Sequence, residues 1–196
     1  MILGNIKKID FDYVSFDKKN KKNKLTIIPN VGGIAREMTG GSQIGIILKK
    51  FLSLTLKNKL TLCLNNISFL PQLAKMDYAV GVKLLCELEI LKAKDVNVKK
   101  NKFILHNQMV DMALALNNKK VFINYFYLSK KYCFDPALIT YNIGPLIKML
   151  SSLPSISENL TIYTPINKDN YLMNPGLEDV SDYLNKSGIN FINIYE

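Results

Sequence analysis

The sequence predicts one α/β domain over residues 1–196, as a compact TIM-like (β/α) barrel that would be incomplete at this length. Short β-rich runs alternate with longer amphipathic runs, and this alternation implies right-handed crossovers and a mostly parallel sheet. Apolar residues make up 48% of the chain and charged residues 21%, which is a globular balance. A complete barrel usually takes about 250 residues, so an open doubly wound parallel sheet is the alternative.

The first half of the chain contains strand patterns on both sides of a lysine-rich loop, followed by alternating elements. Continuous apolar runs such as LTLCL are typical of buried parallel strands, whereas apolar residues three and four positions apart indicate helices. The Gly40-Gly41 pair is expected to precede a helix. In chain order we expect strands at 11–17 and 25–29, a helix at 43–56, a strand at 60–64, a helix at 66–75, a strand at 78–82, a helix at 84–94 and a strand at 95–99.

The second half continues the alternation to the last residues of the sequence. Asn117-Asn118 is a plausible helix stop, and Gly144-Pro145 requires its helix to begin late or to kink. Asn174 can cap the last helix, with Pro175 at its first position and Gly188 after its end. We expect helices at 107–116, 136–150 and 175–187, and strands at 121–127, 160–165 and 191–195.

The formal net charge is +10, and it is concentrated in two blocks of the chain. Residues 1–59 carry a net charge of +8 and residues 92–131 carry +7, while residues 132–196 carry −4. Such a surplus indicates a polyanionic partner. Of the 26 basic residues 25 are lysine, which suits phosphate contacts better than the reading of base edges. Alternatively, the lysines reflect an AT-rich coding sequence. The protein would then be a subunit whose partners are other proteins.

Four lysine clusters lie at expected element boundaries, at 18–24, 99–102, 119–120 and 130–131. Each cluster alone is typical of a solvated loop, but four of them indicate a shared basic rim. We expect no membrane partner, and we expect RNA to contact Lys18, Lys19, Lys21, Lys22, Lys24, Lys99, Lys100, Lys102, Lys130 and Lys131.

The sequence predicts no catalytic residue, no cofactor and no metal site. His106 is the only histidine, and its place at the start of a helix favours capping or surface packing over catalysis. Glu87 and Glu89 are two residues apart and would not share a helix face. The glycine-containing segment 29–42 matches neither the Walker nor the dinucleotide spacing, although it lies between a strand and a helix. A flexible crossover is the favoured interpretation of this segment. Because helix N-termini collect anions, an α/β enzyme that binds a phosphorylated ligand there is the alternative function.

Several classes of protein are excluded by composition. The apolar content is too high for intrinsic disorder, and three widely separated cysteines neither form a disulfide scaffold nor match a usual zinc motif. No stretch of about 18 residues lacks charge, so no membrane span is expected. We expect a protein of a reducing, intracellular compartment.

The order of elements resembles the thirty-kilodalton protein subunit family of ribonuclease P and its relative ribonuclease MRP. The resemblance covers residues 60–190. Its first part is carried by LTLCLNN at 60–66, DYAVGV at 77–82, EILKA at 89–93, DVNV at 95–98 and the helix, turn and strand pattern at 109–125. Its closing part is carried by 160–164, Asn174-Pro175, Asp179-Val180 and Gly188-Ile189.

This resemblance implies a barrel-like α/β subunit that is not itself the catalyst. Such a subunit binds and supports the RNA that cleaves the 5′ leader from precursor tRNA. The implied partners are ribonuclease P RNA, precursor tRNA and other protein subunits of the particle. The implied location is the nucleus in a eukaryote and the cytoplasm in an archaeon.

Overall fold

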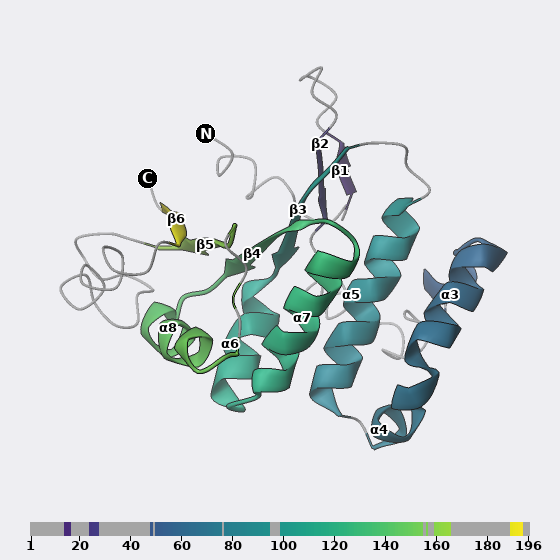
Figure 1. Ribbon diagram of the computed structural model, residues 1–196, viewed down its shortest axis with the longest axis horizontal. Helices are drawn as coiled ribbons and strands as arrows, with labels where there is room; N and C mark the ends of the chain where they lie inside the picture. Colours follow the sequence, from purple (N-terminus) through teal and green to yellow (C-terminus); the bar gives the residue numbers. More distant parts are fainter. Residues whose placement is uncertain are drawn as a thin grey trace, which may run out of the picture.

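The computed structural model describes residues 14–16, 24–27, 48, 50–75, 77–94, 99–154, 156, 159–165 and 189–193 (Figure 1). Its strands are β1 (Val14–Phe16), β2 (Lys24–Ile27), β3 (Lys99–Leu105), β4 (Asp135–Ile139), β5 (Thr161–Thr164) and β6 (Asn190–Asn193). Its helices are α3 (Leu56–Asn66), the 3₁₀ turn η2 (Ile67–Phe69), α4 (Leu70–Ala74), α5 (Tyr78–Lys94), α6 (Asn107–Ala115), α7 (Lys119–Lys131) and α8 (Ile143–Ser151). No described helix is both long enough and apolar enough to cross a bilayer.

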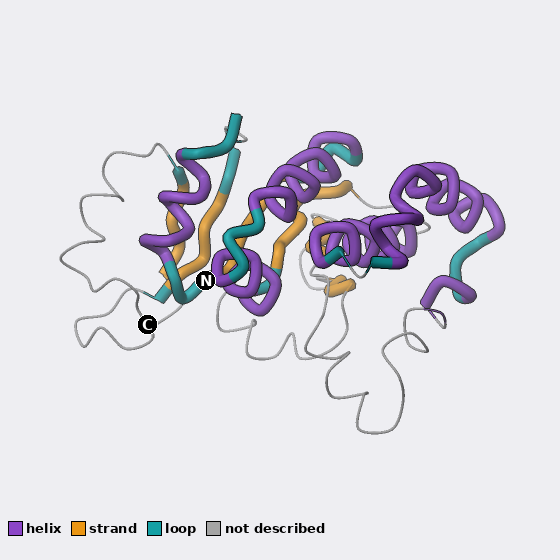
Figure 2. The backbone as a smooth tube through the Cα atoms, turned by 90° about the horizontal axis from the view of Figure 1, so that it is seen from below, coloured by secondary structure: helices purple, strands orange, loops and turns teal. Residues whose placement is uncertain are grey.

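The six strands form one sheet in the order β1-β2-β3-β4-β5-β6. Only β1 and β2 pair antiparallel, and every pair from β2 to β6 is parallel. Each crossover between the parallel strands therefore returns to the adjacent strand. Helices α5, α6, α7 and α8 lie below the strands in Figure 1, and Figure 2 shows the same helices from their outer side. The prediction of an α/β protein with a mostly parallel sheet is confirmed.

The two faces of the sheet belong to different apolar clusters. On one face Phe103, Leu105 and Leu138 pack with the helices in the main core. On the other face a smaller buried cluster contains Ile104 and Tyr163, with Ala137 and Ile139, and the described helices contribute no residue to it. Both faces of β3, β4 and β5 are thus buried, as expected for parallel strands.

Three segments that were predicted as strands are helical, at 60–64, 78–82 and 121–127. Leucines two residues apart fit a strand, but in α3 they alternate between the core, at Leu62, and the solvent, at Leu60 and Leu64. In α5 the segment from 78 to 82 continues directly into the helix predicted at 84–94. Local β-propensity is overridden here by tertiary packing, because α3 packs on α5, and α5 and α7 pack on each other and on the sheet.

Two other predictions need correction around β3 and β4. The strand expected at 95–99 instead begins at Lys99 and runs to Leu105, while residues 95–98 lie outside the described residues. The helix expected at 136–150 is strand β4 followed by α8, which begins at Ile143, just before the Gly-Pro pair.

Most of the other predicted elements that fall on described residues are confirmed. The predicted strands at 11–17 and 160–165 contain β1 and β5, and those at 25–29 and 191–195 overlap β2 and β6, each of which begins one residue earlier. The predicted helices at 66–75, 84–94 and 107–116 correspond to η2 with α4, to α5 and to α6. Within the helix expected at 43–56, residues 48 and 50–52 are helical. The helix expected at 175–187 lies outside the described residues.

Candidate functional site

Described residues of three lysine clusters lie at or next to the amino-terminal edge of the parallel sheet, where β2 to β6 begin. Lys24 begins β2 and pairs in register with Lys99, the first residue of β3, and Lys100 follows. The exposed Lys130 lies in the last turn of α7, which leads into β4 at the same edge. We call Lys24, Lys99, Lys100 and Lys130 the lysine edge.

Further lysines at helix ends lie close to this edge. Helix α5 ends with Lys92 and Lys94 before β3 begins. The side-chain amide of Asn58 donates to the Leu91 carbonyl oxygen at 2.9 Å, so the start of α3 with its lysines lies beside the end of α5. Cations in the last turn of a helix also complement the helix dipole. These lysines do not belong to the four lysine clusters, so the clustering of charge in the sequence did not predict them.

The other predicted RNA-binding lysines have different positions. The Nζ atom of Lys102 lies 3.2 Å from the Tyr163 hydroxyl oxygen, and Lys131 forms an ion pair with Glu87 at 3.1 Å, so both act within the fold. Lys18, Lys19, Lys21 and Lys22 lie outside the described residues. The pair Lys119 and Lys120 begins α7, about 18 Å along the helix from its last residue, so it does not join the edge.

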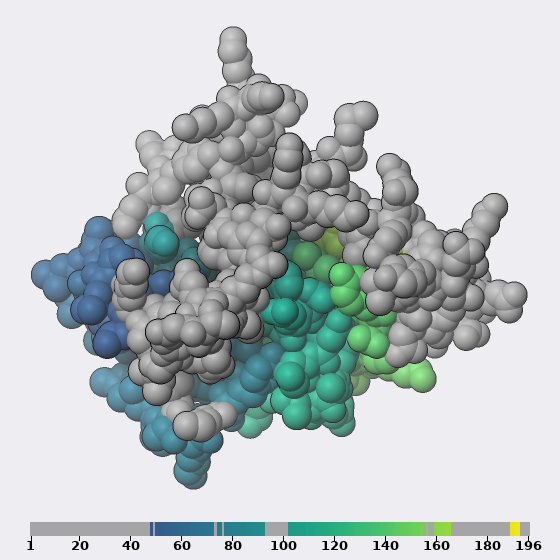
Figure 3. All heavy atoms as spheres, turned by 180° about the vertical axis from the view of Figure 1, so that it is seen from behind, coloured from purple at the N-terminus to yellow at the C-terminus, as the bar shows by residue number. Residues whose placement is uncertain are grey.

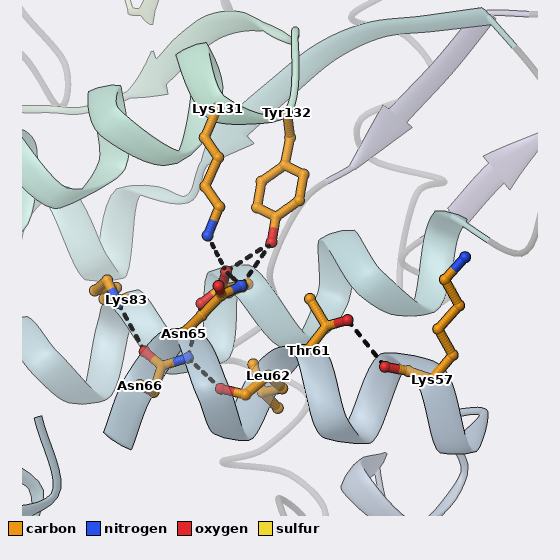
Figure 4. A network of polar contacts seen from close by, with 9 residues as sticks. Lys57, Thr61, Leu62, Asn65, Asn66, Lys83, Lys131 and Tyr132 are labelled. Carbon is orange, nitrogen blue, oxygen red and sulfur yellow. Dashed lines mark hydrogen bonds and ion pairs between the residues drawn. The ribbon is translucent and has the colours of Figure 1, made fainter. Parts of the chain in front are cut away.

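A second polar site lies between α3, α5 and α7, around the fully buried carboxylate of Glu87 (Figure 4). Its Oε1 atom accepts from the Tyr132 hydroxyl at 2.6 Å, from the Asn65 amide at 2.8 Å and from Lys131. Its Oε2 atom accepts from the Asn66 amide at 2.8 Å. Four donors from two neighbouring elements thus converge on one carboxylate.

The electrostatics of this site keep the carboxyl group ionised. Burial by itself raises the pKa of Glu87, but the hydrogen bonds from Tyr132, Asn66 and Lys131 and the charge of Lys131 hold that pKa below its usual value. Burial raises the pKa of Tyr132, and the hydrogen bond to Glu87 and the charge of Glu87 raise it further. The proton between the two groups therefore stays on the phenol. A carboxylate held in this way is a structural anion and not a general acid.

The network extends to Lys83, which is almost fully buried in α5. Its Nζ atom donates to Asn66 Oδ1 at 2.7 Å and lies 4.1 Å from the centre of the Phe69 ring. Burial lowers the pKa of Lys83, partly opposed by the charge of Glu87. Glu89 faces a different partner, because its Oε1 lies 2.6 Å from Lys50 Nζ. The prediction that the two glutamates do not share a helix face is confirmed.

The carboxyl-terminal edge of the sheet carries a smaller polar set, which sequence analysis missed apart from His106. His106 caps α6 by accepting a hydrogen bond from the Gln108 backbone, so the predicted capping role is confirmed. Burial lowers the pKa of His106, with the charge of Asp111 opposing this shift. Thr140 donates to Asp111, and the buried Thr164 hydroxyl has no partner among the described residues. The spacing of these residues gives no recognisable motif, because they come from α6 with its cap, from the end of β4 and from β5.

No protein-family model matches the chain, and neither a curated protein nor a solved structure is significantly similar to it. Among the described residues no group of three or more histidines, cysteines, aspartates or glutamates could hold a metal ion. The segment 29–42, which was the candidate phosphate site, lies outside the described residues. The described residues thus place Lys24 and Lys99 side by side in strand register and hold the Glu87 carboxylate in four hydrogen bonds.

Proposed function

We propose that this protein is a non-catalytic subunit that binds structured RNA through the lysine edge. The observation that carries the proposal is the register of β2 and β3, which pairs Lys24 with Lys99 although 75 positions separate them in the sequence. The ends of α5 and α7 add Lys92 and Lys130, both exposed, beside this pair. An extended row of lysine without arginine favours contacts with the phosphate backbone.

The proposed particle is one of the ribonuclease P type, with precursor tRNA as its substrate and other protein subunits as partners. This part of the proposal rests on the sequence resemblance. Three of the segments that carry the resemblance, at 60–66, 77–82 and 121–125, are helical where the family pattern has strands. The expected helix at 89–93 and the expected strand at 160–164 are present in α5 and β5, and these segments support the resemblance.

We further propose that the sheet is part of an incomplete (β/α) barrel. Sequential strand order places every connecting helix on one face, whereas a doubly wound sheet reverses its order at a switch point. The described strands have no such reversal. The residues of the smaller cluster, with Ile104 and Tyr163 among them, would then face the barrel interior.

A filter-binding titration over a range of salt concentrations tests the RNA proposal. Phosphate contacts release counterions, so we expect log K to fall linearly with log salt, with a slope of magnitude about 0.7 to 0.9 for each contact. Ribonuclease P RNA should bind more tightly than an unrelated structured RNA of equal length. A salt-independent affinity would contradict RNA binding, and equal affinity for the two RNAs would contradict only the ribonuclease P assignment.

A further inference from the structure

A row of exposed leucines and one isoleucine lies along the outermost part of the structure. Seven of the eleven large apolar side chains that the structure describes as exposed fall between residues 48 and 70. Their exposed fractions range from 52% to 74%. We call this set the leucine stripe: Leu48, Leu52, Leu56, Leu60, Leu64, Ile67 and Leu70.

The stripe follows one face of α3, with leucines at every fourth position from 56 to 64. The opposite face of α3 buries Asn58, Leu62 and Asn66 against α5. Helix α3 is the outermost labelled helix in Figure 1, and its atoms (blue) lie at the lateral surface in Figure 3. A surface helix normally buries its leucines and exposes its amides, so this arrangement is the reverse of what stability of one chain favours.

The stripe is large enough to be an interaction surface. Seven apolar side chains between residues 48 and 70 are each more than half exposed, and exposed apolar patches of about 300 to 600 Å² often mark binding sites on soluble proteins. A stable interface buries about 800 Å² on each partner, with an apolar centre and a polar rim. The leucine stripe supplies that centre, and the polar residues that flank it on α3 supply a rim.

We propose that the occupant of the stripe is a second copy of this chain, with the two α3 helices packed antiparallel. An apolar stripe is complementary to itself under a two-fold axis. Lys57 and Lys59 lie in the first turn of α3, while its last turn contains no basic residue. Antiparallel packing places these lysines at the negative end of the second copy's helix dipole, whereas parallel packing brings four lysines together.

The spacing of the stripe also defines how the helices cross. Leu56, Leu60 and Leu64 form a ridge of residues four apart. Two such ridges interlock at a crossing angle of about −50°. Leu60 lies at the middle of the ridge and is therefore the centre of the contact.

Sedimentation equilibrium of the full chain tests this interface. The wild-type protein is expected to be a dimer, and the double variant Leu60→Lys/Leu64→Lys is expected to raise the dimer Kd by at least about tenfold, because it places like charges at the contact. The matched control is Ile123→Lys, which adds a charge at an exposed apolar residue of α7 and should leave the Kd unchanged. Far-ultraviolet circular dichroism checks that each variant is folded.

Thiol cross-linking gives a second readout that needs no leucine variant. Cys63 lies beside the stripe on α3, and Cys133 is exposed beyond α7. A short bismaleimide should link two copies through Cys63 in a Cys133→Ser background, but not through Cys133 in a Cys63→Ser background. The proposal would be overturned by a monomeric wild type or by a lysine variant that remains dimeric. It would also be overturned if the protein were a monomer that binds anionic vesicles through these leucines.

Discussion

Replacement of Glu87 by glutamine is expected to lower the free energy of unfolding by about 3 kcal/mol, because buried donors lose their anionic partner. The carboxylate is fully buried and accepts hydrogen bonds from Tyr132, Asn65, Asn66 and Lys131. A glutamine side chain can accept at only one of its two ends, so its amide group faces one of these donors. For a chain of this length the melting temperature should fall by about 10 °C.

The control for this prediction is Lys131→Met, which removes one donor whose side chain is 28% exposed. Water can replace part of that contact, so we expect a loss of about 1 kcal/mol. Chemical denaturation of both variants measures the difference. A Glu87→Gln loss no larger than that of Lys131→Met would show that the network does not support the α3–α5–α7 interface.

The same carboxylate makes stability depend on pH. The pKa of Glu87 is lowered in the folded state, so its contribution is fully present above the ordinary glutamate pKa and is lost as pH falls through the folded value. The difference between wild type and Glu87→Gln should therefore be largest near neutral pH and should shrink in acid. A difference that stays constant down to acid pH would contradict an ionised Glu87.

The variant Tyr125→Phe is expected to cost about 2 kcal/mol, because it leaves buried backbone groups without a partner. The Tyr125 hydroxyl accepts from the Ala137 backbone N–H at 2.7 Å and lies within donating distance of the Phe103 carbonyl oxygen. Phe103 pairs in register with Pro136, which has no N–H group to donate. The hydroxyl therefore joins β3 to β4 where the backbone ladder is interrupted.

Burial raises the pKa of Tyr125 well above its ordinary value, so the hydroxyl remains a donor at all working pH values. The matched control is Tyr127→Phe on the same helix, where the ring is 56% exposed and a change within about 0.5 kcal/mol is expected. Equal stability of the two variants in urea would contradict the role given to Tyr125.

Local sequence pattern predicted four strands of the sheet, but it assigned β4 to a helix and three helical segments to strands. Strands β5 and β6 are short alternating or apolar runs, and their class follows from local pattern alone. The segments at 60–64 and 121–127 have equally strong β-propensity, yet they are helical because their partners are distant parts of the chain. Their assignment depends on tertiary contacts that no local window contains.

In the candidate sites too, local features were predictable from the sequence, whereas contacts between distant residues were not. The lysine runs were visible in the sequence, but the pairing of Lys24 with Lys99 depends on strand register. The partners of Glu87 come from α3 and α7, 21 to 45 positions away, so no spacing rule could have found them. His106 was predictable as a cap because a cap is a local feature.

If the lysine edge binds RNA, two matched double variants should differ in the salt dependence of RNA binding. Lys99→Gln/Lys100→Gln removes two charges from the edge, and Lys119→Gln/Lys120→Gln removes two from the opposite end of α7. The first variant should lower the magnitude of the log K against log salt slope by about two, while the second should match the wild type. Equal slopes for the two variants, or a larger loss of slope for the second, would contradict RNA binding at the lysine edge.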